Sequence, residues 1–174
     1  MCDTYINMCD TCNIGTLASE VVALLQERNF TFATAESCTG GAVSQAITSV
    51  AGCSSVMRGA VVAYHNDVKS EVLGVLPDTL ATVGAVSEEV VKQMVCGVSH
   101  LMVADCAIAT SGIAGPGGGT LDKPVGTVWL AVKVKDKVVT ELLQLKDEGR
   151  EVNVRNTVAE ALRLLCQLLA EVTF

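Results

Sequence analysis

Apolar positions along the first half of the chain switch between two spacings. Residues three and four apart predict helices, whereas short continuous apolar or β-branched runs predict strands. The predicted elements are a helix from Leu17, a strand over 31–35, a helix over 39–50, a strand over 59–64 and a helix over 67–73. The run over 59–64 is nearly all apolar, which is typical of a strand buried on both faces.

The second half begins with the clearest helix start. Ser87 is a good N-cap, and Glu88 and Glu89 would interact favourably with the helix dipole. Apolar residues continue from there at helical spacing as far as Met102. Further elements are predicted as strands over 106–110, 127–134 and 138–145, and as a closing helix whose apolar stripe runs from Val158 to Val172.

Only Lys135-Asp136-Lys137 separates the last two predicted strands. So short a link allows a hairpin but no parallel crossover, so the sheet is expected to be mixed. The fold class predicted is α/β, a three-layer α/β/α domain with a five-stranded, mostly parallel mixed sheet. We expect this domain to occupy residues 16–174 and residues 1–15, which show no period, to be an extension.

Charge and composition limit the ligands of such a domain. The 174 residues are 50% apolar but only 3% aromatic, and the net charge is −7. This charge argues against general attraction to nucleic acid or an anionic membrane, so an anionic ligand needs a local site. No stretch is apolar enough to predict a membrane span, and no basic leader precedes Arg28, which favours the cytoplasm.

Cysteine usage suggests no metal centre. Eight cysteines are present, and Cys38, Cys53, Cys96, Cys106 and Cys166 stand among apolar or small residues, as free core thiols do. Cys9 and Cys12 have the spacing of half a zinc site, but no second pair lies nearby. A metal or redox role for Cys2, Cys9 and Cys12 is therefore only a minor alternative.

Four segments carry unusual polar chemistry for an apolar scaffold: 34–41, 64–69, 111–119 and 123–127. The first three each follow a predicted strand. If those strands are parallel, all three segments meet at the carboxyl edge of the sheet, where α/β proteins usually bind ligands. This convergence predicts a functional site.

Ser37 lies where a predicted strand turns into a helix. The N–H groups of Thr39, Gly40 and Gly41 are expected to be unpaired and to point toward it, where they could stabilise an oxyanion. Ser37 is then a nucleophile if a proton acceptor is near, or otherwise only a helix cap.

Three residues of the next segment could be that acceptor. Lys69 qualifies only if desolvation lowers its pKa, with Tyr64 relaying or orienting the proton; otherwise Lys69 is a solvated helix residue. His65 could form a triad with Asp67 or Asp105. However, neighbours in a strand point to opposite faces, so Tyr64 and His65 are not expected to share one site.

The glycine-rich segment 112–119 matches neither the Rossmann nor the Walker fingerprint. Two interpretations stay open. It is an anion nest assisted by Lys123, or it is a tight structural loop.

Five motifs together resemble one known family. They are Ala35-Glu36-Ser37-Cys38-Thr39-Gly40-Gly41, Tyr64-x-Asn66-x-x-Lys69, Gly84-Ala85-Val86-Ser87, Gly112-Ile113-Ala114-Gly115-Pro116-x-Gly118-Gly119 and Lys123-Pro124-Val125-Gly126-Thr127. In this order they resemble the C-terminal domain of the CinA (competence/damage-inducible protein) family, also found alone as nicotinamide-nucleotide amidohydrolase. The resemblance covers residues 17–169, and the larger domain that precedes this one in full-length CinA proteins is expected to be absent.

The resemblance implies an activity and a set of site residues. The activity is hydrolysis of nicotinamide mononucleotide to nicotinate mononucleotide and ammonia, without metal or other cofactor, with Ser37 as nucleophile, Lys69 as base and Tyr64 assisting. The substrate-binding residues expected are Glu36, Thr39, Gly40, Gly41, Asn66, Ser111, Gly112, Gly115, Gly118, Lys123, Thr127 and Arg155. For the phosphate, Lys123, Arg150 and Arg155 are candidates, with Arg155 ranked slightly ahead because it is expected to open the last helix.

Departures from the family pattern concern substrate preference rather than chemistry. His65 replaces a common serine, Ser111 a commoner threonine, and Ala51-Gly52-Cys53 a more usual Pro-Gly-Ser. The alternatives are therefore a pyridine-nucleotide-binding module without turnover, or an amidohydrolase for another amide. A homodimer is compatible with the apolar helices.

Overall fold

The computed structural model describes residues 13–171, whose five strands form one mixed sheet in the order β2-β1-β3-β4-β5. The strands are β1 (Phe32–Glu36), β2 (Met57–Val62), β3 (Cys106–Gly112), β4 (Thr127–Val134) and β5 (Lys137–Gln144). β1 runs parallel to both of its neighbours, β2 and β3, whereas β3, β4 and β5 pair antiparallel. The predicted five-stranded mixed sheet is confirmed.

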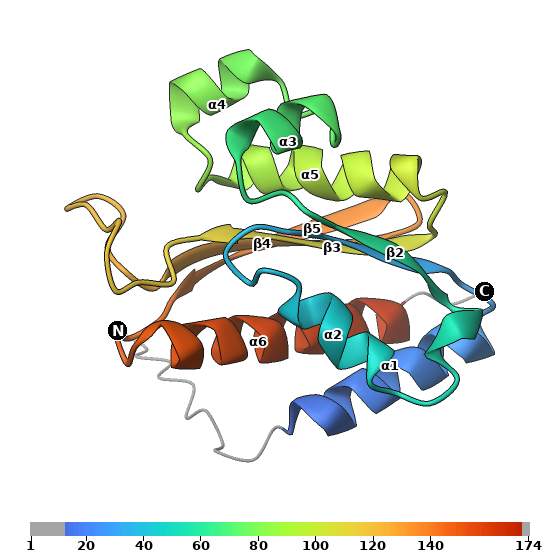
Figure 1. Ribbon diagram of the computed structural model, residues 1–174. Coiled ribbons are helices and arrows are strands. Elements are labelled where there is room, and N and C mark those ends of the chain that lie inside the picture. The colour runs from blue at the N-terminus through green and yellow to red at the C-terminus, as the bar shows by residue number, and fades with distance from the viewer. Residues whose placement is uncertain (1–12, 172–174) are drawn as a thin grey trace.

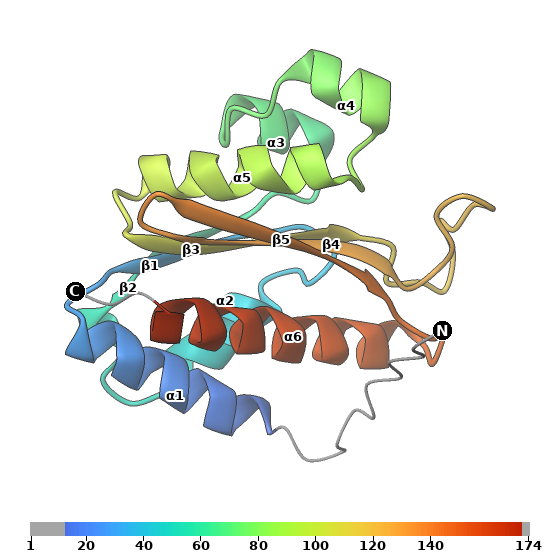
Figure 2. The same cartoon turned by 180° about the vertical axis from the view of Figure 1, so that it is seen from behind.

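Helices cover both faces of this sheet, so the three-layer prediction is also confirmed (Figures 1 and 2). α1 (Ile14–Glu27), α2 (Ala42–Thr48) and α6 (Arg150–Glu171) lie on one face, and α5 (Glu88–Leu101) lies on the other. α3 (Asn66–Glu71) and α4 (Pro77–Val83) stack on the outer side of α5. A short 3₁₀ turn, η1 (Cys53–Ser55), precedes β2.

Successive side chains of the central strands point to opposite faces of the sheet, so the core has two parts. Phe32, Ile108 and Leu130 pack against the layer of α1, α2 and α6. Facing α5 are small residues of β1 and β3, such as Ala35 and Ala109. Small side chains at these positions let α5 pack close to the sheet.

α3 is held at a defined place by a glycine of α5. Gly97 packs directly against the carbonyl of Leu73, just beyond the end of α3, and a Cβ there would overlap that oxygen. The close approach therefore needs glycine. It fixes the height of α3 above the sheet and hence the position of Lys69.

One predicted strand differs in its environment. β2 alternates between half-buried and exposed residues and has no fully buried position, so the expectation of burial on both faces is wrong. The reason is its place at the edge of the sheet, where only β1 pairs with it.

Several boundaries also differ from prediction. α1 begins at Ile14, β3 continues through Ser111 to Gly112, and α6 begins at Arg150, well before Val158. α4 was not predicted at all. It is seven residues long with no buried residue, so it leaves no apolar stripe in the sequence.

Other sequence expectations have mixed outcomes. Ser87 caps α5 as predicted, accepting a hydrogen bond from Val90 N. Cys96 is exposed rather than a core residue. Cys2, Cys9 and Cys12 lie outside the described residues, and within 13–171 no group of acidic, cysteine or histidine side chains could hold a metal ion. No helix over this range is long and apolar enough to cross a membrane.

Candidate active site

The turn after β1 and the corner after β2 meet at one edge of the sheet, because the two strands are parallel neighbours. Ser37 is the first residue after β1, and α3, which follows the β2 corner, carries Lys69. Lys69 Nζ lies 3.2 Å from Ser37 Oγ. The predicted convergence thus brings the candidate nucleophile and the candidate base into contact.

Lys69 is a buried lysine, with 1% of its surface exposed. Its Nζ donates to Ala63 O at 2.7 Å and to Tyr64 O at 3.3 Å. Among residues 13–171 no carboxylate forms an ion pair with it. Burial therefore lowers the pKa of Lys69 below its ordinary value. The alternative of a solvated surface lysine is wrong.

Glu36 is a fully buried residue directly below this turn. Its carboxylate accepts hydrogen bonds from the hydroxyls of Thr34 and Thr39. It also accepts from three backbone N–H groups at the start of α2, those of Gly41, Val43 and Ser44, at 2.8–3.0 Å. These five hydrogen bonds tie Glu36 to β1, to the turn that carries Ser37 and to the start of α2, so Glu36 anchors that turn.

Two of the three N–H groups that were expected to hold an oxyanion are already hydrogen-bonded within the protein. Gly41 N donates to Glu36, and Gly40 N donates to Ser37 O, so neither N–H group is unpaired. Among the described residues, the N–H groups of Cys38 and Thr39 donate to no oxygen of the protein. They are the remaining candidates for holding an oxyanion near Ser37.

Gly40 and Gly41 instead shape the turn. Both have positive φ angles, +62° and +104°, which an L side chain rarely adopts. Thr39 is buried, and its hydroxyl contacts the hydroxyl of Thr110 as well as Glu36. Thr39 thus supports the turn from within, whereas Gly40 is exposed, with nothing near its Cβ position.

Cys38 is adjacent to Ser37 but differs from it chemically. Burial raises the pKa of the Cys38 thiol to about 12. The thiol is therefore protonated near neutral pH and unsuited to attack an amide. Ser37, which is only half-buried, is the accessible candidate nucleophile of the turn.

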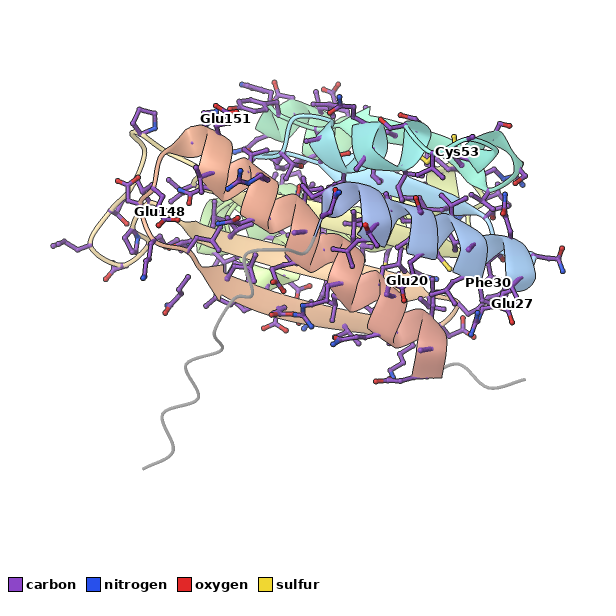
Figure 3. All side chains as sticks on the ribbon, turned by 90° about the horizontal axis from the view of Figure 1, so that it is seen from below. Glu20, Glu27, Phe30, Cys53, Glu148 and Glu151 are labelled. Carbon is purple, nitrogen blue, oxygen red and sulfur yellow. The ribbon has the colours of Figure 1, made fainter. Side chains whose placement is uncertain are left out.

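Arg150 links three parts of the site. It is the first residue of α6, and its guanidinium donates to Tyr64 Oη at 2.9 Å and to Gly115 O at 3.1 Å. Arg155 was ranked ahead of Arg150 as the phosphate ligand on the expectation that it opens the last helix. That expectation is wrong, because α6 begins at Arg150. Arg155 is exposed further along the helix. Figure 3 shows the neighbours Glu148 and Glu151 at this end of α6.

Tyr64 takes part through two different groups. Its carbonyl accepts from Lys69 Nζ, whereas its phenol is exposed and accepts from Arg150. The phenol makes no hydrogen bond to Ser37 or Lys69. The geometry fits orientation of the site better than a direct proton relay.

The base of the glycine-rich segment is tightly packed, whereas residues 116–120 are exposed, so the interpretation as an anion nest stays a prediction. Gly112 and Gly115 lie against Val128 and Val125 so closely that a Cβ at either would clash. Ser111 Oγ donates to Ala85 O, and Lys123 Nζ donates to Val83 O and Val86 O. Gly118 has a positive φ of +86°, and a Cβ there would make only an ordinary contact with Ile113.

The buried hydroxyl of Thr127, at the start of β4, has no hydrogen-bond partner within the described structure. Because side chains alternate along a strand, it shares the α5 face with Ser111. Asn66 is exposed at the start of α3, also without a side-chain hydrogen bond there. Both groups are therefore available to a ligand.

The histidine alternative is only partly assembled, because His65 Nδ1 lies 3.3 Å from Asp67 Oδ2 but no hydrogen bond joins His65 to Ser37 in the described structure. His65 is exposed and caps α3, with Nδ1 accepting from Asp67 N, and it does not share a site with Lys69. Asp105 lies before β3, at the opposite edge, where it binds Thr31 and Lys135. The prediction that Tyr64 and His65 point apart is consistent with this arrangement.

Two contributors were missed in the sequence. Thr110 contacts Thr39 below the turn, and Asn153 donates from α6 to Ala114 O in the glycine-rich segment. Asn153 had a visible signal, since it is a polar residue on the buried stripe of α6. Thr110 lies at the end of an apolar strand, where no feature of the sequence indicates its contact with Thr39.

Comparison with known proteins identifies the family. The family model described as the CinA C-terminal domain matches residues 14–169. A CinA-like protein of Cytophaga hutchinsonii is 48% identical over 157 residues, covering 90% of this chain and 37% of that protein. One from Thermotoga maritima is 54% identical over 112 residues, covering 64% and 28%. The chain thus spans about a third of the length of such relatives.

Solved structures indicate the same family. The competence/damage-inducible protein CihA from Agrobacterium tumefaciens superposes with a TM-score of 0.88 at 40% identity, covering 91% of this chain and 96% of that one. The competence damage-inducible protein A from Klebsiella pneumoniae gives a TM-score of 0.89 at 37% identity, covering 92% and 99%. By family model, sequence and structure alike, the chain belongs to the CinA C-terminal domain family.

Proposed function

We propose that this domain is a serine/lysine amidohydrolase that converts nicotinamide mononucleotide to nicotinate mononucleotide and ammonia. The observation that carries the proposal is the 3.2 Å contact between Ser37 Oγ and the buried Nζ of Lys69. A buried lysine without a carboxylate partner is the form of lysine that can act as a base near neutral pH.

The contacts of Lys69 suit the neutral amine. A neutral amine has two N–H groups and one lone pair. Ala63 O and Tyr64 O can take the two N–H groups, which leaves the lone pair for the hydroxyl proton of Ser37. Lys69 then removes that proton as Ser37 Oγ attacks the carboxamide carbon.

The rest of the cycle follows from this first step. The C–N bond breaks as the Lys69 ammonium returns the proton to the leaving nitrogen, so ammonia departs and an ester on Ser37 remains. Water, deprotonated by Lys69, hydrolyses the ester, and its proton returns to Ser37. The N–H groups of Cys38 and Thr39 are proposed to hold the oxyanion in both halves.

The nucleotide's phosphate is assigned to Arg150. Its guanidinium has five N–H donors, of which Tyr64 and Gly115 engage only two nitrogens. The side chain is exposed at the site in a chain of net charge −7, where an anion needs a local cation. Thr127, Asn66 and the backbone of the glycine-rich loop are proposed to contact the remainder of the substrate.

The test is ammonia release from nicotinamide mononucleotide by the purified protein in the presence of a chelator. The proposal predicts turnover and the formation of equimolar nicotinate mononucleotide. Stabilisation of the fold by the nucleotide without any ammonia would instead support the binding-module alternative. Ammonia released only from other carboxamides would place the substrate elsewhere.

A further inference from the structure

The connector, defined as residues 83–87 from the last residue of α4 to the N-cap of α5, has a distinctive pattern of hydrogen bonds. Four successive carbonyls each accept from a side chain. Val83 O and Val86 O accept from Lys123 Nζ at 2.9 and 2.8 Å. Gly84 O accepts from Ser87 Oγ, and Ala85 O from Ser111 Oγ. Three of these four carbonyls therefore bind side chains from outside the connector, those of Lys123 and Ser111.

The loop that carries Lys123 is a unit with its own internal bonds. At its base, Ile113 N donates to Thr127 O and Gly126 N donates to Ile113 O. At its tip, Thr120 N donates to Lys123 O, and Lys123 N donates to Thr120 Oγ1. Gly119 lies against the backbone of Val125, which joins the two arms. Residues 113–126 are therefore one internally bonded unit.

This loop extends beyond the end of the sheet (Figures 1 and 2). On one side α6 holds it, through Arg150 to Gly115 O and Asn153 to Ala114 O. On the other side, within the described structure, Lys123 is the side chain that ties it to the connector. Lys123 also complements the C-terminal end of α4, where unpaired carbonyls attract a cation.

We propose that Lys123 is a positioning residue, which holds the loop against the connector, and that it does not bind the substrate's phosphate. Moving Nζ to a phosphate would leave Val83 O and Val86 O without their donor. This inference rests on the proposed function for its kinetic consequences. It adds that the loop's placement, and through Gly115 that of Arg150, depends on a lysine outside the phosphate site.

The kinetic test compares Lys123→Met with the native protein on nicotinamide mononucleotide and on nicotinamide riboside, which lacks the phosphate. A positioning residue acts on both substrates, so KM should rise about tenfold for each while kcat stays within about twofold. Lys123→Arg should restore most of the loss, because a guanidinium can also donate to two carbonyls. A rise in KM confined to the phosphorylated substrate would show a phosphate ligand and overturn the proposal.

Lys146→Met is the matched control. Lys146 is an exposed lysine between β5 and α6, near the same end of the molecule, and its side chain makes no hydrogen bond in the described structure. Its substitution should leave both KM values unchanged. An equal effect of Lys146→Met and Lys123→Met would reduce the role of Lys123 to general charge and would also contradict the proposal.

A second experiment tests the proposal without measuring turnover. Hydrogen exchange of the substrate-free protein should show faster exchange in both 115–122 and 83–88 for Lys123→Met, and no change for Lys146→Met. Ser111→Ala should speed exchange in the connector alone. If no ammonia is ever released but this exchange pattern appears, the proposed function fails while the link by Lys123 stands. Unchanged hydrogen exchange in Lys123→Met would overturn the proposal that Lys123 links the loop to the connector.

Discussion

At the scale of single residues, the state of Lys69 sets the pH dependence of the proposed reaction. Burial lowers its pKa from the ordinary 10.5, and only the neutral amine can act as base. We therefore expect kcat/KM to rise with pH through this lowered pKa and to level off before pH 10.5. A pH–rate profile of the native protein measures this dependence of kcat/KM on pH. A rate that falls over this range would contradict Lys69 as the base.

The same shift makes a prediction about stability. Between the folded pKa of Lys69 and 10.5, the unfolded chain binds more protons than the folded one, so this lysine makes the free energy of unfolding rise with pH. Buried Cys38 and Cys106 act oppositely above about pH 9, since folding raises the pKa of each thiol to about 12. Denaturant unfolding at several pH values should therefore show native stability, relative to Lys69→Met, increasing with pH. A constant difference would contradict a lowered pKa.

Glu36 is the residue on which the turn depends. Glu36→Gln replaces one acceptor oxygen by an amide donor that faces N–H and hydroxyl donors. We expect a loss of about 3 kcal/mol in the free energy of unfolding, measured by urea denaturation, and a lower kcat in the variant that still folds. Exposed Glu20→Gln on α1 is the control and should change neither. A Glu36→Gln protein with native stability would refute the anchor.

At the scale of elements, the packing of α3 on α5 positions Lys69, the proposed base. Gly97→Ala places a methyl group against Leu73 O and should push α3 away, which lengthens the distance between Lys69 and Ser37. We expect about 2 kcal/mol of lost stability and a reduced kcat. Gly117→Ala, with nothing near its Cβ position and an ordinary φ, is the stability control and should leave the free energy of unfolding unchanged. Equal behaviour of the two variants would contradict the close-contact interpretation.

The elements also show what periodicity can and cannot predict. Helical spacing and the Ser87 cap predicted α5 well because its apolar face is buried along its length. α4 has no buried residue and therefore no pattern to detect. β2 appeared fully buried because its residues are apolar, yet strand order, which a single sequence does not reveal, places it at the edge.

For the site, convergence could be predicted but hydrogen-bond partners could not. Strand-to-turn motifs predicted that Ser37 and Lys69 share an edge, since parallel strands align their carboxyl ends. That Glu36 occupies the N–H groups of α2 depends on a side-chain conformation with no sequence signal. The same holds for Lys123, whose carbonyl partners lie about 40 residues away.

At the scale of the whole molecule, topology brings the parts of the site together. The parallel strands β2, β1 and β3 end at one edge, and β4 begins there because it is antiparallel to β3. α6 then returns Arg150 to the same edge. Ser37 and Lys69, the proposed reacting groups, follow different strands, so their contact depends on the pairing of β1 with β2.

The most direct test of the central claim is a double-mutant comparison of kcat/KM for nicotinamide mononucleotide. Because Ser37 and Lys69 act in one step, Ser37→Ala and Lys69→Met should each lower kcat/KM by at least about 10³-fold, and the double variant should lose little more than either alone. Thermal unfolding of each variant shows whether its fold is retained. A folded Ser37→Ala or Lys69→Met protein with activity within about tenfold of native would contradict the serine/lysine mechanism.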